Sequence, residues 1–153
     1  MLSRKAKYGL KAMIYLAKAS DSGPVLIADL AREEKIPKKF LELILLTLKN
    51  HGILQSRKGK GGGYYLGKSC NEITIGKLVR ILDGPLAPVP CVSETAYAEC
   101  DECLDEKTCG IRLVMKDVRD AIAEILDGTS LADVLERVEK VEQLEKGALL
   151  YYI

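Results

Sequence analysis

Four cysteines lie close together in a charged stretch of the chain that follows two prolines. They are Cys91, Cys100, Cys103 and Cys109. Cysteines that serve as small apolar groups usually occur singly on buried helices or strands, whereas four in a polar loop are typical of metal ligands. Spacing alone does not distinguish one soft metal from another, so zinc and an iron–sulfur cluster both fit. Cys70 lies apart from the four and is expected to be a structural thiol.

The segment before this loop is predicted to contain a helix-turn-helix. Apolar residues at spacings of three and four indicate helices over residues 4–19, 27–34 and 38–50, and Gly52 closes the third. Only residues 35–37 separate the second helix from the third, as in helix-turn-helix units. The third would be the recognition helix, whose N-terminal end meets base edges in the major groove.

A basic, glycine-rich loop follows the third helix. Residues 57–63 separate two short predicted strands, 53–56 and 64–66, and so form the tip of a hairpin. Glycines permit close backbone approach, and cations at the tip suit the phosphates and minor groove of DNA. A nucleotide-binding loop is not expected, because no helix begins after the glycines. The predicted fold class is therefore mostly α with a small β-hairpin, a winged helix-turn-helix domain.

Charge is distributed unevenly along the chain. Residues 1–68 contain 14 Lys and Arg against 5 Asp and Glu, whereas residues 69–153 contain 9 against 17. A basic half of this kind is expected to face a polyanion, here double-stranded DNA, although a solvated charged surface without a partner is the alternative. The predicted DNA-binding residues are Arg4, Lys5, Lys38, Lys39, Glu42, Arg57, Lys58, Lys60 and Tyr64.

A long amphipathic helix is predicted after the cysteine loop. Apolar residues from Ile111 to Leu126 repeat at helical spacing, and a last helix is expected over residues 131–145 after a break at Thr129 and Ser130. A long helix that leaves a compact domain has no other core to join, so we expect it to pair with its copy in a homodimer. Two-fold symmetry implies a roughly palindromic operator.

These elements divide the chain into three predicted parts. They are a winged helix-turn-helix DNA-binding domain at 1–83, a cysteine-containing sensor loop at 84–109, and dimerisation and C-terminal helices at 110–153. The apolar run 12–17 is too short to span a bilayer or to serve as a signal peptide, so a cytoplasmic location without membrane contact is expected. The cytoplasm keeps thiols reduced, which disfavours a disulfide framework.

An enzymatic function is not expected. With His51 as the only histidine, no Ser/His/Asp or Cys/His arrangement is available. His51 is expected to favour the C-terminal end of the recognition helix rather than to bind a metal. An iron–sulfur carrier or electron-transfer protein would explain the cysteines but would leave the basic half unexplained.

Three motifs carry a resemblance to a known family. They are residues 7–17 in the first helix, 36–42 in the third, and the wing motif 57–64, which is the most distinctive. In these motifs the chain resembles the winged-helix transcriptional regulators that include IscR, NsrR and CymR, and the resemblance extends over nearly the whole sequence. It implies a DNA-binding regulator, expected to be a repressor, that acts as a dimer.

The resemblance also implies roles for particular residues. In the cluster-binding branch of this family, three loop cysteines hold an iron–sulfur cluster whose presence or loss alters DNA binding. By position, these are similar to Cys91, Cys103 and Cys109, and the recognition-helix glutamate is similar to Glu42.

The chain departs from the family pattern at the fourth ligand. Relatives with three cysteines recruit a ligand of another type, such as a histidine just past the last cysteine, but Arg112 stands there and a guanidinium does not ligate. Cys100 adds a fourth thiol, and four thiolates are the usual complement of a 2Fe–2S or 4Fe–4S cluster, of which 2Fe–2S is favoured. Tetrahedral zinc and a dithiol switch between Cys100 and Cys103 remain alternatives.

The C-terminal residues are apolar and aromatic. Cysteine-metabolism regulators of the same family dock onto cysteine synthase, and a tail of Tyr151, Tyr152 and Ile153 is similar to the C-terminal peptides that this enzyme accepts. The alternative is that the tail folds back on the last helix.

Overall fold

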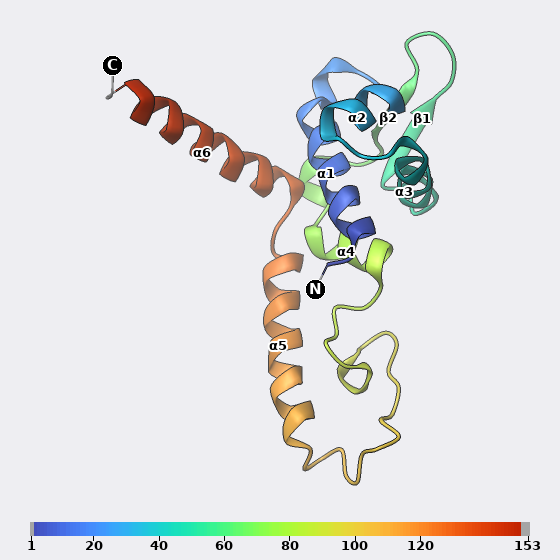
Figure 1. Cartoon of the computed structure of the whole chain (residues 1–153), viewed down its shortest axis with the longest axis vertical. Helices are drawn as coiled ribbons and strands as arrows, with labels where there is room; N and C mark the ends of the chain where they lie inside the picture. The colour runs from blue at the N-terminus through green and yellow to red at the C-terminus, as the bar shows by residue number, and fades with distance from the viewer. Residues whose placement is uncertain (1, 151–153) are drawn as a thin grey trace.

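The computed structural model describes residues 2–150, which fold into a compact head with two long helices attached (Figure 1). The predicted docking tail of Tyr151, Tyr152 and Ile153 lies outside the described residues. In chain order the elements are α1 Arg4–Lys18, η1 Ser20–Ser22, α2 Ile27–Glu34, α3 Lys38–Asn50, β1 Leu54–Arg57, β2 Gly63–Leu66, η2 Cys70–Glu72, α4 Ile75–Asp83, η3 Pro90–Val92, α5 Gly110–Asp127 and α6 Leu131–Leu150.

The core of the head lies where α1, α3 and α4 meet. Met13, Leu45 and Leu78, one from each helix, are fully buried there because each helix carries apolar residues at a helical period. Gly9 allows α1 to approach α4 closely, since a Cβ at this position would lie 2.3 Å from Leu82 Cδ1. The tight crossing of α1 and α4 therefore depends on a glycine of the first-helix motif.

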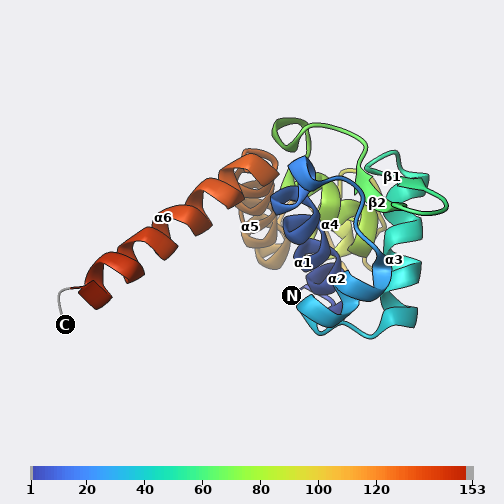
Figure 2. The ribbon, with the colours of Figure 1, turned by 90° about the horizontal axis from the view of Figure 1, so that it is seen from above.

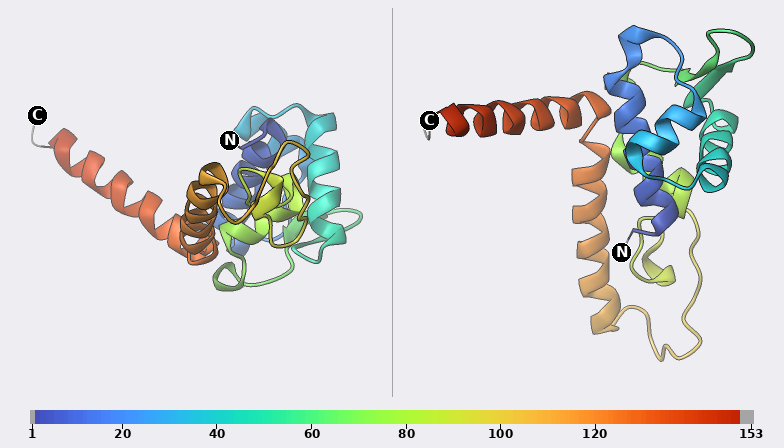
Figure 3. Two further views of the ribbon diagram at one scale, coloured as in Figure 1. Left: turned by 90° about the horizontal axis from the view of Figure 1, so that it is seen from below. Right: turned by 45° about the horizontal axis from the view of Figure 1, so that its top comes forward.

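The two C-terminal helices extend from the head in different directions. α5 begins at the far end of the cysteine loop and runs back to the head, whereas α6 begins at the head and then projects outward (Figures 1 and 2). Two backbone hydrogen bonds hold the junction, from Ile75 N to Thr129 O and from Leu131 N to Ile73 O, each 2.9 Å. The Leu131 side chain is fully buried in the core of the head. The first turn of α6 thus belongs to the head, as the tilted view in Figure 3 also shows.

The predicted fold class is confirmed, with a two-stranded hairpin placed after the third helix. α2 and α3 begin and end at the predicted residues, and α6 continues past the predicted end to Leu150. α4 was not predicted as a separate helix. Within residues 2–150, no helix is long and apolar enough to cross a membrane. The domain boundaries at residues 83 and 109 stay a prediction.

Candidate nucleic-acid interface and cysteine loop

A sharp turn between α2 and α3 sets the direction of α3. Lys35 adopts a left-handed conformation with φ of 53°, and the buried Ile36 donates its backbone N–H to Ala31 O at 2.9 Å. Pro37 then precedes the helix and fixes the backbone at its N-terminal end. This turn leaves one face of α3 in the core and the opposite face open to solvent.

The hairpin forms a wing beside α3. Its strands are antiparallel, with Leu54 opposite Leu66 at the base and Arg57 opposite Gly63 near the tip. Lys49 of α3 donates from Nζ to Ser56 Oγ at 2.7 Å, which ties the wing to the helix. The tip requires glycine at Gly61, where φ is +72°, a conformation that side-chain-bearing residues rarely adopt.

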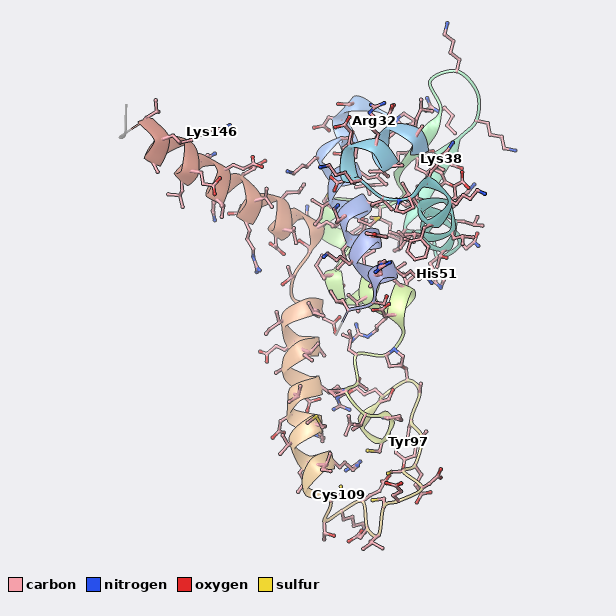
Figure 4. All side chains as sticks on the ribbon, viewed as in Figure 1. Arg32, Lys38, His51, Tyr97, Cys109 and Lys146 are labelled. Atoms are coloured by element: carbon pink, nitrogen blue, oxygen red, sulfur yellow. The ribbon has the colours of Figure 1, made fainter. Side chains whose placement is uncertain are left out.

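An open groove of about 430 Å³ lies between the start of α2, the start of α3 and the wing. Five of the predicted DNA-binding residues line it: Lys38, Glu42, Arg57, Lys58 and Tyr64. Figure 4 labels Lys38 on this side of the head, far from the cysteine loop. Predicted residues from the recognition helix and from the wing thus share one surface of the molecule.

The other predicted DNA-binding residues lie elsewhere on the head. Lys39 is exposed on α3, one residue beyond the groove, and Lys60 is exposed at the wing tip. Arg4 and Lys5 lie in the first turn of α1, where the backbone N–H of Ser3 donates to the Asp83 carboxylate at 2.9 Å. The two residues at the start of α1 are therefore not part of the groove.

Two residues of α3 that the sequence interpretation did not single out are also exposed on this surface. Leu43 is 63% exposed and Leu46 is 48% exposed, although both are large aliphatic side chains. Both lie outside the buried stripe formed by residues such as Leu41 and Leu45. Their positions outside the apolar stripe of α3 are the sequence signal that could have identified them as exposed residues.

The cysteine loop is anchored to α5 at two points. Near its beginning, Arg119 of α5 donates from Nη1 to the backbone oxygen of Val92 at 2.6 Å, and its Nη2 lies 3.6 Å from Glu94 Oε1. At its end, Cys109 is the residue just before the first turn of α5, and Leu113 N donates to Cys109 O at 3.1 Å. The loop is therefore attached to α5 near both of its ends.

Three of the four loop thiols are close enough to influence one another. Burial raises the pKa of the Cys103 thiol, and the neighbouring Cys109 and Cys100 raise it further. Cys103 also donates its backbone N–H to Cys100 O at 3.0 Å, which closes a tight turn between them. Cys91 lies on η3, which packs against α5 nearer the head. Cys103 thus lies near both Cys100 and Cys109, and Cys91 is not among the groups that influence it.

Glu106 links two parts of the loop. The Tyr97 hydroxyl donates to its carboxylate, and this bond raises the pKa of Tyr97 to about 12. The other carboxylate oxygen lies 3.8 Å from Arg112 Nε on α5. In the described part of the chain, that Nε is buried and has no hydrogen-bond partner. Arg112 thus forms an ion pair with the loop.

The donor chemistry of the loop fits a thiolate-bound metal centre, although the four thiols do not converge. Four free thiols lie in a segment that is nearly devoid of regular structure, and Cys109 immediately precedes α5. No group of three or more His, Cys, Asp or Glu side chains within residues 2–150 is arranged as metal ligands would be. Ligation by all four thiols would therefore require the loop to rearrange.

One face of α5 is apolar and uncovered in the single chain. None of its residues is buried, and Ile111, Val114 and Ile125 are 68%, 57% and 64% exposed. Val118, Ile122 and Leu126 line an apolar groove of about 710 Å³ against α4 and residues 85–88. Water-exposed apolar surface of this extent is typical of a protein interface.

Comparison with known proteins identifies the family. The model of Rrf2, described as an iron-dependent transcriptional regulator, matches residues 2–137. The chain belongs to the Rrf2 family. An rrf2-like HTH-type transcriptional regulator of Rhodobacter capsulatus is 43% identical over 138 residues, 88% of this chain and 92% of that protein. The HTH-type transcriptional regulator CymR of Bacillus subtilis is 33% identical over 152 residues, 99% of each chain.

Solved structures of Rrf2-family members share this fold. The structure of CymR, the global cysteine regulator of B. subtilis, has a TM-score of 0.75 and 34% identity, covering 90% of this chain and 97% of that one. The structure of T. potens IscR has a TM-score of 0.74 and 28% identity, covering 92% and 90%. The family resemblance inferred from the motifs is confirmed. Like its relatives, this member is a DNA-binding transcriptional regulator and not an enzyme.

Proposed function

We propose that this Rrf2-family member is a homodimeric, cytoplasmic repressor whose operator binding is modulated by an iron–sulfur cluster held in the cysteine loop. The observation that carries the proposal is the presence of four free thiols in one loop that leads, at Cys109, directly into α5. α5 is also the helix that connects this loop to the DNA-binding head. A single helix, α5, thus joins the proposed ligands to the head that carries the DNA-binding residues.

Each side chain of the interface has a role in this proposal. Lys38, Arg57 and Lys58 line the groove and neutralise phosphates there, and Lys39, Lys60, Arg4 and Lys5 neutralise phosphates outside the groove. Glu42 lies one turn into the recognition helix, where a carboxylate accepts a hydrogen bond from cytosine N4. Tyr64 holds the start of β2 against the segment before α2, because its backbone pairs with that of Val25.

The proposed ligands are Cys91, Cys100, Cys103 and Cys109. A cluster bound by them would supply a redox-active and labile inorganic centre. On the protein side, Arg119 holds the segment of Cys91 against α5, and Cys109 leads directly into that helix. Drawing the four sulfurs together therefore pulls on residues 84–90, which connect the loop to α4. A 2Fe–2S cluster is favoured over 4Fe–4S, and zinc is the alternative occupant.

The dimer in this proposal forms through the apolar face of α5. Its exposed Ile111, Val114 and Ile125 would be covered by the same face of a second copy in an isologous contact. Ile125→Asp should dissociate the dimer in sedimentation experiments. Leu43→Asp places the same charge on an equally exposed position of α3 and should leave the dimer intact. If both variants remain dimeric, α5 is not the dimer interface.

The cluster is tested by purifying the protein without oxygen from iron-fed cells. We expect a coloured protein with equal amounts of iron and acid-labile sulfide. Cys103→Ala should lose the colour, whereas Cys70→Ala, at a half-buried thiol outside the loop, should keep it. Cys100→Ala distinguishes a four-thiolate site from a three-cysteine site. A colourless protein with one zinc per chain would assign the loop to a structural metal instead.

Modulation is tested separately, by comparing the affinities of the cluster-loaded and cluster-free protein for duplex DNA. The proposal predicts that the two forms differ on at least one operator selected from random sequence. Identical affinity on every selected operator would refute modulation, even where the cluster itself is present.

A second candidate function is regulation of cysteine metabolism through contact with cysteine synthase. It is favoured by the match to CymR over 99% of both chains. The contact would use Tyr151, Tyr152 and Ile153. Pull-down of cysteine synthase by the full chain, and its loss on removal of these three residues, would support this function. Equal recovery with and without them would exclude the tail as the docking peptide.

A further inference from the structure

Recognition helix α3 carries an apolar strip on the side that points away from the core. Side chains three and four residues apart share a helix face, so Leu43 and Leu46 lie together, between Lys39 and Asn50. All four are exposed, and they lie opposite the buried stripe that includes Leu41. The two leucines are 63% and 48% exposed, so they contribute little to the core of their own domain.

The charges around the strip indicate what covers it. Lys39 belongs to the strip itself, Lys38 stands beside it, and the wing supplies Arg57 and Lys58 across the groove. Within this surface Glu42 is the acidic exception. A partner with a polyanionic backbone would match the cations, and small apolar groups that lie between its charges would match the leucines. Duplex DNA has this chemistry, and the strip is continuous with the predicted DNA interface.

We propose that Leu43 and Leu46 recognise the methyl groups of thymines in the major groove. The C5-methyl group of thymine is the apolar group that base edges present there, and aliphatic side chains contact it directly. The inference rests on the proposed DNA-binding surface and deepens it. Each half of the operator then contains thymines opposite the middle of α3, next to the base that Glu42 contacts.

The test removes single methyl groups from the DNA. An operator is selected from random duplexes with the full-length protein, and each thymine in turn is replaced by deoxyuridine, which lacks only the C5-methyl group. Burying one such carbon contributes about 0.8 kcal/mol, so affinity should fall about four-fold at each contacted thymine. Leu43→Ala or Leu46→Ala should abolish the difference between thymine and deoxyuridine at its own position.

The control variant is Leu144→Ala, which truncates a 73% exposed leucine of α6 and should preserve the full effect of deoxyuridine. The inference is overturned if the selected operator binds equally well with deoxyuridine at every thymine. It is also overturned if the α3 variants change only the sedimentation of the free protein, which would assign the strip to a protein contact. Failure to select any sequence would instead refute the proposed DNA-binding role.

Discussion

The contact between the start of β2 and the segment before α2 provides a sharp test of how the wing is held to the head. Gly63 begins β2 with φ of +138°, and a Cβ at this position would lie 2.3 Å from the backbone oxygen of Val25 and 2.4 Å from its carbonyl carbon. Backbone atoms cannot rotate away as a side chain can. Gly63→Ala must therefore push β2 away from the segment that precedes α2.

The displacement breaks a defined pair of hydrogen bonds. Val25 and Tyr64 exchange two backbone bonds, each 2.8 Å, and both depend on the close approach at Gly63. Each is worth roughly 1 kcal/mol net, and the conformation itself costs a residue with a side chain about 1–3 kcal/mol. We therefore expect Gly63→Ala to lower the free energy of unfolding by about 3–5 kcal/mol.

Gly61→Ala is the matched control. Gly61 also has a positive φ, +72°, but nothing lies within 4 Å of a Cβ built there. This variant incurs only the conformational cost, about 1 kcal/mol.

Urea unfolding followed by far-ultraviolet circular dichroism measures both variants, and an unchanged denaturant slope keeps the comparison valid. Because Tyr64 and the wing cations move with β2, Gly63→Ala should also weaken duplex binding more than Gly61→Ala does. Equal losses of stability in the two variants would show that the contact with Val25 does not hold the wing.

Three further predictions concern α6, α5 and the wing tip. Leu131→Ala removes a fully buried side chain and should lower the free energy of unfolding by about 2–5 kcal/mol in urea titrations. Arg80 donates to Asp127 at 2.9 Å and lowers the pKa of the Asp127 carboxyl. The bridge therefore stabilises the folded state fully above about pH 4, where the carboxylate of the unfolded chain is ionised. This stabilisation is lost as the pH falls through the lowered pKa of the folded state. Both groups are partly exposed, so Asp127→Asn should cost about 0.5–1 kcal/mol at pH 7 and less at pH 3, as measured by chemical denaturation. Lys58→Ala should reduce the slope of log affinity against log salt by about 1 in binding titrations, whereas Lys146→Ala, on α6, should not change it.

Local sequence patterns were sufficient to predict the helices and the hairpin that form the groove with the predicted DNA-binding residues. α2 and α3 have strong apolar periodicity and end at a left-handed residue or before a glycine, so their bounds were predictable from neighbouring residues alone. The wing followed from its glycines and cations. The five predicted DNA-binding residues that line the groove came from α3 and the wing, which is why they lie on one surface.

Features that depend on tertiary contacts were not predictable in this way. The burial of Leu131 arises because the chain returns from α5 to pair Ile73 and Ile75 with residues 129–131, a contact between segments far apart in sequence. The attachment of the segment that follows Cys91 has a similar cause, because Arg119 of α5 holds it by the backbone oxygen of Val92. Spacing along the chain gives no information about either contact.

The connections of α5 determine how a change in the cysteine loop could reach the DNA-binding surface. At its far end the helix begins at Cys109, and at its near end Asp127 is bridged to Arg80 of α4. Between them, Arg119 holds the loop by Val92 and Glu94. A rearrangement of the thiols that moves Cys109 or the segment held by Arg119 must therefore shift α5 relative to α4 or strain residues 84–90. Since α4 packs against α1 and α3, and α5 carries the proposed dimer face, that shift would alter the spacing of the two recognition helices. By linkage, an operator that selects one spacing must favour the thiol arrangement that produces it.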